Sequence, residues 1–415
     1  MQSPNHHIKN IVAFSSLTLG LLAIHSQPLL AQATHTTQDW AQATTGYKND
    51  SLRDYLARLK SALLLANKQP EQAQPLKFSA SVVAEGRTGI RHLRIRNFQF
   101  LSDGTPDVGE YNLGAGSWPS VVGVLGSAVA QDFLTQAAIK GIPLDELEVV
   151  FTSRPGAAPS ATGGRGVTYP RALTYTAYIV SPASDAQLED LRRTVERVSP
   201  VLNLVSQSQN IEHGQLIYTQ TPKDRGNALP GLRDFLDGKR AAAKLPPTRP
   251  TTPTRRGGGE PPLRAHIKVE GATGIRHIRT DTSNFQMIHD NPRYLAGHNL
   301  GPVAEEHILG VMITCLTHIF EIQATNRGVD LDSLELEVEG TLTRRIGSIE
   351  TPPKFENIRY RVHIGSPESK ETIEQLQQAV ESSCPIYNML KDSQEIKGNI
   401  VRGPYREPLT IEAAF

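Results

Sequence analysis

EGRTGIRHLR, at residues 85–94, returns almost unchanged as EGATGIRHIR at residues 270–279. Each stretch joins a glycine turn to alternating residues of the kind that form a β-strand. Three later pairs follow in the same order: residues 112–114 with 299–301, 141–148 with 328–335, and 199–203 with 384–388. Such a recurrence indicates an internal repeat. The sequence therefore predicts two copies of one α+β module.

The 415 residues divide into five predicted parts. Residues 1–33 are typical of a secretory signal peptide, because Lys9 precedes a short apolar run at 11–24, and Ala31 and Ala33 form a cleavage pattern. An N-terminal segment with an amphipathic helix, led by Ser51, follows at 34–76. The remaining parts are a first repeat at 77–222, a Pro/Arg/Gly-rich linker at 223–262 and a second repeat at 263–415.

Composition excludes some functions. A net charge of +1 gives no general attraction to nucleic acid or to an anionic membrane. An aromatic content of 6% also argues against a surface that stacks bases. We therefore expect a soluble bacterial protein that is periplasmic or otherwise exported, with no nucleic-acid partner and no membrane contact after the signal peptide is removed. The alternative interpretation of residues 1–33 is an uncleaved N-terminal anchor, although the apolar run is short for a membrane span.

Cys315 and Cys384 are the only cysteines, and both lie in the second repeat. In the first repeat Ala128 and Ser199 stand opposite them. Cys315 falls within an apolar predicted helix, whereas Cys384 precedes Pro385 and is expected at a helix N-terminus, where a thiolate is favoured. Two thiols that meet in space can act as a peroxidatic and resolving pair. In an oxidising compartment they can equally form a structural disulfide.

The repeats resemble the OsmC/Ohr family, the organic hydroperoxide reductases and their relatives. The resemblance rests on the glycine turn, on an acidic residue about ten positions before the helical cysteine, and on Cys-Pro-x-x-Asn at 384–388. It implies an α+β fold of tandem OsmC-like domains, with antiparallel sheets wrapped around central helices. It also implies that Cys315 is peroxidatic, that Cys384 is resolving, and that Glu306 or Glu305 assists them.

The family's arginine lies in the glycine turn, where the first repeat has Arg87 and the second has Ala272. One hypothesis is that the repeats form an intramolecular pseudo-dimer with exchanged N-terminal strands, so that Arg87 completes a single site around Cys315. Arg91 and Arg276 are rival sources of this charge. The other interpretation is that the loss of arginine at Ala272 marks a dead site.

The resemblance implies a hydroperoxide substrate, an unidentified dithiol reductant and no cofactor. Because the repeats replace the family's two subunits, we expect a monomer. His318 lies one turn after Cys315, but this spacing alone favours a packed core histidine over a metal ligand. The alternative function is a non-enzymatic envelope protein, with a structural disulfide and a ligand- or partner-binding cleft between the repeats.

Overall fold

The computed structural model describes residues 51–106, 109–157, 166–226, 229–244, 262–280, 283–349 and 351–406. The predicted signal peptide at 1–33 lies outside the described residues. The helix expected in the N-terminal segment is α2 (Leu52–Ala66), and Ser51 caps it by accepting a hydrogen bond from the backbone N–H of Asp54. Two short 3₁₀ helices are η1 (Pro70–Ala73) and η3 (Arg293–Leu295).

One order of elements occurs twice. The first half contains β1 (Leu76–Ala84), β2 (Arg91–Ile95), β3 (Phe98–Ser102), α3 (Ser117–Lys140), β4 (Glu146–Ala157), β5 (Thr168–Val180), α4 (Asp185–Val198), α5 (Pro200–Ser206) and β6 (Gln215–Gln220). The second half contains β7 (Leu263–Val269), β8 (Arg276–Thr280), β9 (Ser283–His289), α7 (Ala304–Arg327), β10 (Ser333–Leu342), β11 (Phe355–Ser366), α8 (Lys370–Ser383), α9 (Pro385–Lys391) and β12 (Ile396–Arg402). The predicted α+β class is confirmed.

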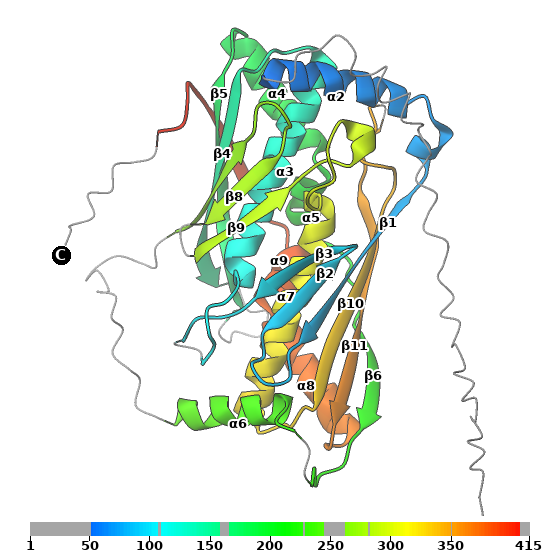
Figure 1. The fold of residues 1–415 in the computed structure, drawn as a ribbon, viewed down its shortest axis with the longest axis vertical. Coiled ribbons are helices and arrows are strands. Elements are labelled where there is room, and N and C mark those ends of the chain that lie inside the picture. The colour runs from blue at the N-terminus through cyan, green and yellow to red at the C-terminus, as the bar shows by residue number, and fades with distance from the viewer. Residues whose placement is uncertain are drawn as a thin grey trace, which may run out of the picture.

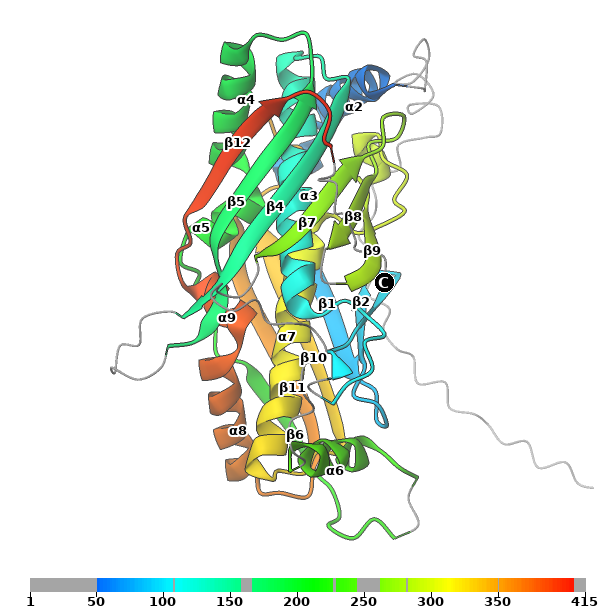
Figure 2. The same ribbon diagram turned by 90° about the vertical axis from the view of Figure 1, so that its left-hand side faces the viewer.

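Each half gives its first three strands to the sheet of the other half (Figures 1 and 2). The strand orders are β3-β2-β1-β10-β11-β6 and β12-β5-β4-β7-β8-β9. At the two crossings, Val82 pairs with Leu336 and Ile267 pairs with Val149, both in antiparallel ladders. The last strand of each half, β6 or β12, adds in parallel to the other half's sheet. The predicted exchange of N-terminal strands is therefore confirmed for the described residues.

Helices α3 and α7 pack against each other between the sheets (Figure 1). Both are apolar enough to span a membrane by composition, but both are mostly buried inside the protein, as core helices are. Each ends at a glycine in the left-handed conformation, Gly141 with φ 69° and Gly328 with φ 67°. The central position of α7 places Cys315 in the core, where strands from both halves surround it.

Two further helices occupy equivalent places in the halves. Tyr55 of α2 packs on Gly274, in the turn before β8, and Phe235 of α6 (Leu232–Ala243) packs on Gly89, in the turn before β2. Helix α6 lies inside the predicted linker 223–262, so the linker prediction was too long. The physical reason is an amphipathic pattern that buries Leu232, Phe235 and Leu236, and a cap at Gly231 formed by the carboxylate of Asp234.

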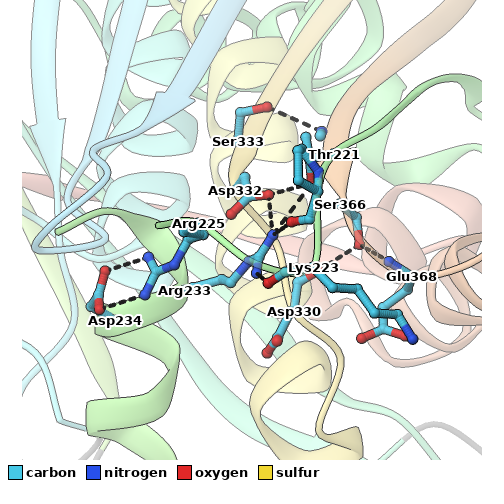
Figure 3. Close-up of polar contacts among 12 residues, drawn as sticks. Thr221, Lys223, Arg225, Arg233, Asp234, Asp330, Asp332, Ser333, Ser366 and Glu368 are labelled. Atoms are coloured by element: carbon cyan, nitrogen blue, oxygen red, sulfur yellow. Dashed lines mark hydrogen bonds and ion pairs between the residues drawn. The ribbon is translucent and has the colours of Figure 1, made fainter. Parts of the chain in front are cut away.

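Helix α6 is fixed to the second half by ion pairs (Figure 3). Arg233 is buried, pairs with Asp332 at 2.6 Å and donates to the carbonyl of Pro222. Arg225 holds the Asp234 carboxylate with two hydrogen bonds, of 2.6 and 2.8 Å. Arg240 pairs with Asp330 at 2.8 Å, just beyond the end of α7. These contacts hold α6 as a cover over one end of the α7 core.

Candidate active site

The two thiols meet in the core. Cys315 lies in the middle of α7 and is 2% exposed, and Cys384 is the N-cap of α9 and is 0% exposed. Their side chains are in hydrogen-bonding contact, and both are free thiols. The predicted proximity of Cys315 and Cys384 and the predicted helix N-terminal position of Cys384 are therefore both observed.

The two thiols differ in acidity. Burial opposes the thiolate of Cys315, but the Cys384 thiol, the backbone N–H of Ile386 and the charge of Arg91 together lower its pKa. Burial and the contact with Cys315 raise the pKa of Cys384 well above the ordinary value. The start of α9 therefore favours a thiolate at Cys315. The backbone N–H groups of Ile386 and Tyr387 lower the pKa of Cys384 as well, as expected at a helix N-terminus, but burial and the contact with Cys315 outweigh them.

The arginine whose charge acts on this pair is Arg91, not Arg87. The Arg87 side chain is 73% exposed and lies 4.0 Å from Glu85 within its own turn. Arg91 is 1% exposed, and its charge acts on Cys315. The hypothesis that Arg87 completes the site is therefore corrected. The first half does supply the cation, but from the inward face of β2 rather than from the tip of the turn.

Arg91 is held by carboxylates from both halves. Its Nη2 lies 2.8 Å from Glu110, in the loop before α3, and its Nη1 lies 2.7 Å from Glu321 of α7. Glu110 also pairs at 2.7 Å with Lys239 of α6, and lies 2.8 Å from Nε2 of His318. Burial opposes ionisation of Glu110, but its three partners hold its pKa well below the ordinary range. Burial raises the pKa of Glu321 to about 8.

Glu305 and Glu306 lie in the first turn of α7, whereas Cys315 lies in the middle of the same helix. Ten residues of α-helix rise about 15 Å, so α7 itself separates Glu305 from Cys315. Glu306 pairs with Arg96 at 2.7 Å, and Glu305 accepts from Gln131 at 3.4 Å. The carboxylates that hold the buried arginine are Glu110 and Glu321 instead. The predicted assistance of Glu305 or Glu306 is corrected, because α7 already begins at residue 304 and leaves no loop to fold back.

A cavity of about 280 Å³ lies between the exchanged hairpins β2–β3 and β8–β9, and its lining includes Thr314, the neighbour of Cys315 in α7, but not Cys315 itself. Thr314 and Ser117 line its inner end, and the Ser117 hydroxyl lies close enough to favour the thiolate of Cys315, without a hydrogen bond of good geometry. Leu101 and Leu113, both exposed, line its outer side. Most of the remaining wall is apolar and includes Leu93, Phe100, Phe285, Met287 and Val311. The cavity can admit a molecule with an apolar body as far as Thr314 and Ser117, which lie next to the buried thiol.

Glu110, His318 and Glu321 have ligand atoms within 4.8 Å of one another, a grouping that could hold a metal ion. The same carboxylates already bind Arg91 and Lys239. A divalent ion would have to displace or approach two buried cations, which electrostatics disfavours. The donors present therefore fit an ion-pair network better than a metal site.

Residues 297–398 match the sequence model of the family described as OsmC-like protein. Among solved structures, the chain is similar to an OsmC like protein from Mycoplasma pneumoniae, with 20% identity and a TM-score of 0.25 over 31% of this chain and 89% of that chain. It is also similar to an organic hydroperoxide resistance protein OsmC from Legionella pneumophila, with 18% identity and a TM-score of 0.24 over 30% and 88%. A comparison with curated proteins gave no match.

Proposed function

We propose that this chain, whose residues 297–398 match the OsmC-like protein family, is a thiol-dependent hydroperoxide reductase that uses Cys315 and Cys384. The observation that carries the proposal is the contact in the core between two free thiols, Cys315 in the middle of α7 and Cys384 at the start of α9, with the charge of Arg91 acting on Cys315. A low pKa marks the thiol that attacks, and a touching second thiol can resolve the product. The apolar cavity beside Cys315 supports an organic hydroperoxide as the substrate.

The reaction balances in three steps. The Cys315 thiolate attacks the terminal peroxide oxygen, the O–O bond breaks, and the leaving alkoxide takes up a proton to become an alcohol. Cys315 is then a sulfenic acid. The Cys384 sulfur attacks it, forms the disulfide and releases water. An external dithiol reduces this disulfide and is itself oxidised to a disulfide.

Arg91 supports the first step by its position. Its charge acts on the thiolate of Cys315 in the ground state and stabilises negative charge that develops on the departing oxygen. Glu110 and Glu321 fix the guanidinium from two sides, so little reorganisation is needed when the charge moves. Arg91 comes from the first half of the chain and Cys315 from the second, which makes the proposed site a composite of the halves.

Export and partners complete the proposal. An exported protein meets an oxidising environment, so the Cys315–Cys384 pair would rest as a disulfide until a dithiol partner reduces it. The apolar run at 11–24 and the cleavage pattern at 31–33 support export. The exchanged sheets already join two halves, and this supports a protein that works as a monomer.

Pre-reduced protein treated with cumene hydroperoxide tests the function. We expect rapid loss of both thiols, one equivalent of alcohol per disulfide, and no reaction in Cys315→Ser. In Cys384→Ser we expect a sulfenic acid at Cys315 that a dimedone probe traps. The reaction with cumene hydroperoxide should outpace that with hydrogen peroxide, which gains nothing from an apolar cavity.

The complete burial of both sulfurs favours the second candidate, a structural disulfide beside a ligand-binding cleft, because buried cysteines are usually inert. Slow thiol loss, equal for both peroxides and unchanged in Cys384→Ser, would support it and exclude the reductase. In that case the disulfide should raise the unfolding midpoint without affecting any turnover.

A further inference from the structure

A buried polar network lies beside α3, at the place that corresponds to the thiol site beside α7. Ala128 and Ser199 stand at the thiol positions, and Arg276 stands where Arg91 does. Arg276 is 0% exposed, and its Nε–H donates to Ser127 Oγ at 3.2 Å. This side of the molecule cannot perform thiol chemistry, but its arginine remains and is connected to a chain of side chains.

That chain runs from Arg276 to the cavity beside Cys315. Ser127 Oγ lies 2.9 Å from Nδ1 of His289, and Nε2 of His289 lies 2.8 Å from Nδ1 of His307. His307 lines the cavity and stacks on Phe100, with ring centroids 4.7 Å apart. The thiol-less side of the fold therefore reaches the wall of the thiol site through three consecutive hydrogen bonds.

Chemistry sets the direction of these hydrogen bonds. A guanidinium has no acceptor, so Ser127 Oγ must accept from Arg276. The only acceptor for the Ser127 hydroxyl among the described residues is Nδ1 of His289. A neutral His289 then carries its proton on Nε2 and donates it to Nδ1 of His307. Both rings are neutral because burial holds the pKa of His289 well below its usual range and lowers that of His307 to about 3.

A neutral His307 whose Nδ1 accepts must carry its proton on Nε2. Within the described part of the chain no group takes this N–H. In the same cavity the hydroxyl of Ser102 is buried without a hydrogen-bond partner among the described residues, and the hydroxyl of Ser117, which lies close to Cys315, makes no hydrogen bond of good geometry. Both side chains are more than nine-tenths buried. An apolar cavity with three donors at its inner wall that lack a hydrogen bond of good geometry is built for a ligand with a polar head.

We propose that Arg276, Ser127 and His289 fix His307 as a hydrogen-bond donor, and that His307, with Ser102 and Ser117, holds the oxygen-bearing head of an apolar hydroperoxide next to Cys315. The inference rests on the proposed function for the identity of the ligand. His307 is a positioning residue in this arrangement: it binds the substrate oxygen and leaves the thiol's acidity unchanged. The thiol-less place beside α3 thus serves the single thiol site instead of forming a second one.

His307→Phe keeps the ring that stacks on Phe100 and removes the donor. We expect the KM for cumene hydroperoxide to rise about fivefold, the value of one net hydrogen bond, while the pKa of Cys315 and the rate with hydrogen peroxide stay unchanged. Arg94→Ala, at an exposed position of β2, is the matched control and should change nothing. An equal effect on both peroxides, or none, would overturn the inference.

Binding separates this inference from the proposed function. The alcohol product, 2-phenyl-2-propanol, can be titrated calorimetrically into Cys315→Ser protein, which needs no turnover. Weaker binding in Cys315→Ser/His307→Phe supports the inference even if the wild type reduces no peroxide, whereas equal binding refutes it. Nitrogen-15 NMR of the imidazoles gives a second readout: His307 should be the Nε2–H tautomer in the wild type and lose that preference in Ser127→Ala.

Discussion

Nη1 of Arg91 lies 2.7 Å from Oε2 of Glu321, although 230 residues separate them in the chain. The contact joins β2 of the first half to α7, the helix that carries Cys315. Around it the core holds two cations, Arg91 and Lys239, and one carboxylate whose pKa is strongly lowered, Glu110. One negative charge is still needed for balance, and a thiolate at Cys315 can supply it while Glu321 stays protonated.

Arg91→Lys should slow the reaction with cumene hydroperoxide roughly tenfold at neutral pH. A lysine lacks the planar fork with which Arg91 donates to both Glu110 and Glu321, so its charge would not be held in the same position relative to Cys315. The pKa of Cys315, followed by thiolate absorbance, should rise. Arg87→Ala, in the turn before β2, is the control, and its exposed side chain predicts wild-type behaviour. A slower reaction and a higher pKa of Cys315 in Arg87→Ala, with neither in Arg91→Lys, would instead identify Arg87 as the partner of the thiol.

Glu305 and Glu321 should make the protein less stable as pH rises from acid to neutral. Burial raises the pKa of Glu305 to about 7 and of Glu321 to about 8, above the ordinary value of 4.5. Between pH 4.5 and these raised pKa values, the folded protein keeps protons on Glu305 and Glu321 that the unfolded chain has released. The free energy of unfolding therefore falls as the pH rises. The loss for Glu305 is on the order of 3 kcal/mol.

Glu305→Gln should remove that part of the pH dependence, because glutamine cannot release a proton. Denaturant unfolding at pH 4.5 and pH 7.5 measures it, with Glu339→Gln, at an exposed ion pair on β10, as the control. A slope identical in wild type and Glu305→Gln would mean that Glu305 is ionised in the folded protein.

Much of the fold followed from the sequence because the repeat fixed both the number of modules and their order. The alternation of buried and exposed residues in β2 also predicts which arginine points toward the core. Arg91, Leu93 and Ile95 are buried and His92 and Arg94 are exposed, so period-two reading places Arg91 on the inner face, whereas Arg87 sits in a turn. The family resemblance places the charge in the glycine turn, at Arg87, whereas the periodicity of β2 favours Arg91.

Other parts of the site could not be inferred from local patterns. Glu110 is in a loop and Lys239 in a stretch dominated by linker composition, and they meet only because α6 crosses to the turn before β2. Glu305 and Glu306 appeared close to Cys315 by sequence distance, but a continuous helix makes ten residues a long separation. The hydrogen-bond chain from Arg276 to His307 draws on α3, β8, β9 and α7, and no spacing rule connects these elements.

Gly89→Ala and Gly274→Ala form a matched pair. Both glycines have positive φ, 66° and 72°, and an added Cβ would overlap Phe235 in one case and Tyr55 in the other. Each change should cost roughly 1–3 kcal/mol of stability. Only Gly89→Ala should also raise the pKa of Cys315, because the Gly89 carbonyl accepts a hydrogen bond from Nη1 of Arg91, whose charge acts on Cys315. A shift of this pKa in Gly274→Ala alone would contradict the role of Arg91 at the thiol site.

Cleavage of the chain between α6 and β7 tests the exchanged architecture. A protease site inserted within residues 245–261 would separate the halves covalently, yet each six-stranded sheet takes strands from both. The separated halves would have to break the ladders between β1 and β10 and between β4 and β7, and expose the apolar faces of α3 and α7. We therefore expect the two fragments to elute together in size-exclusion chromatography and to separate only in denaturant. An intact chain with a scrambled insert of equal length controls for the insertion, and fragments that elute apart under native conditions would show that each half folds without the other's strands.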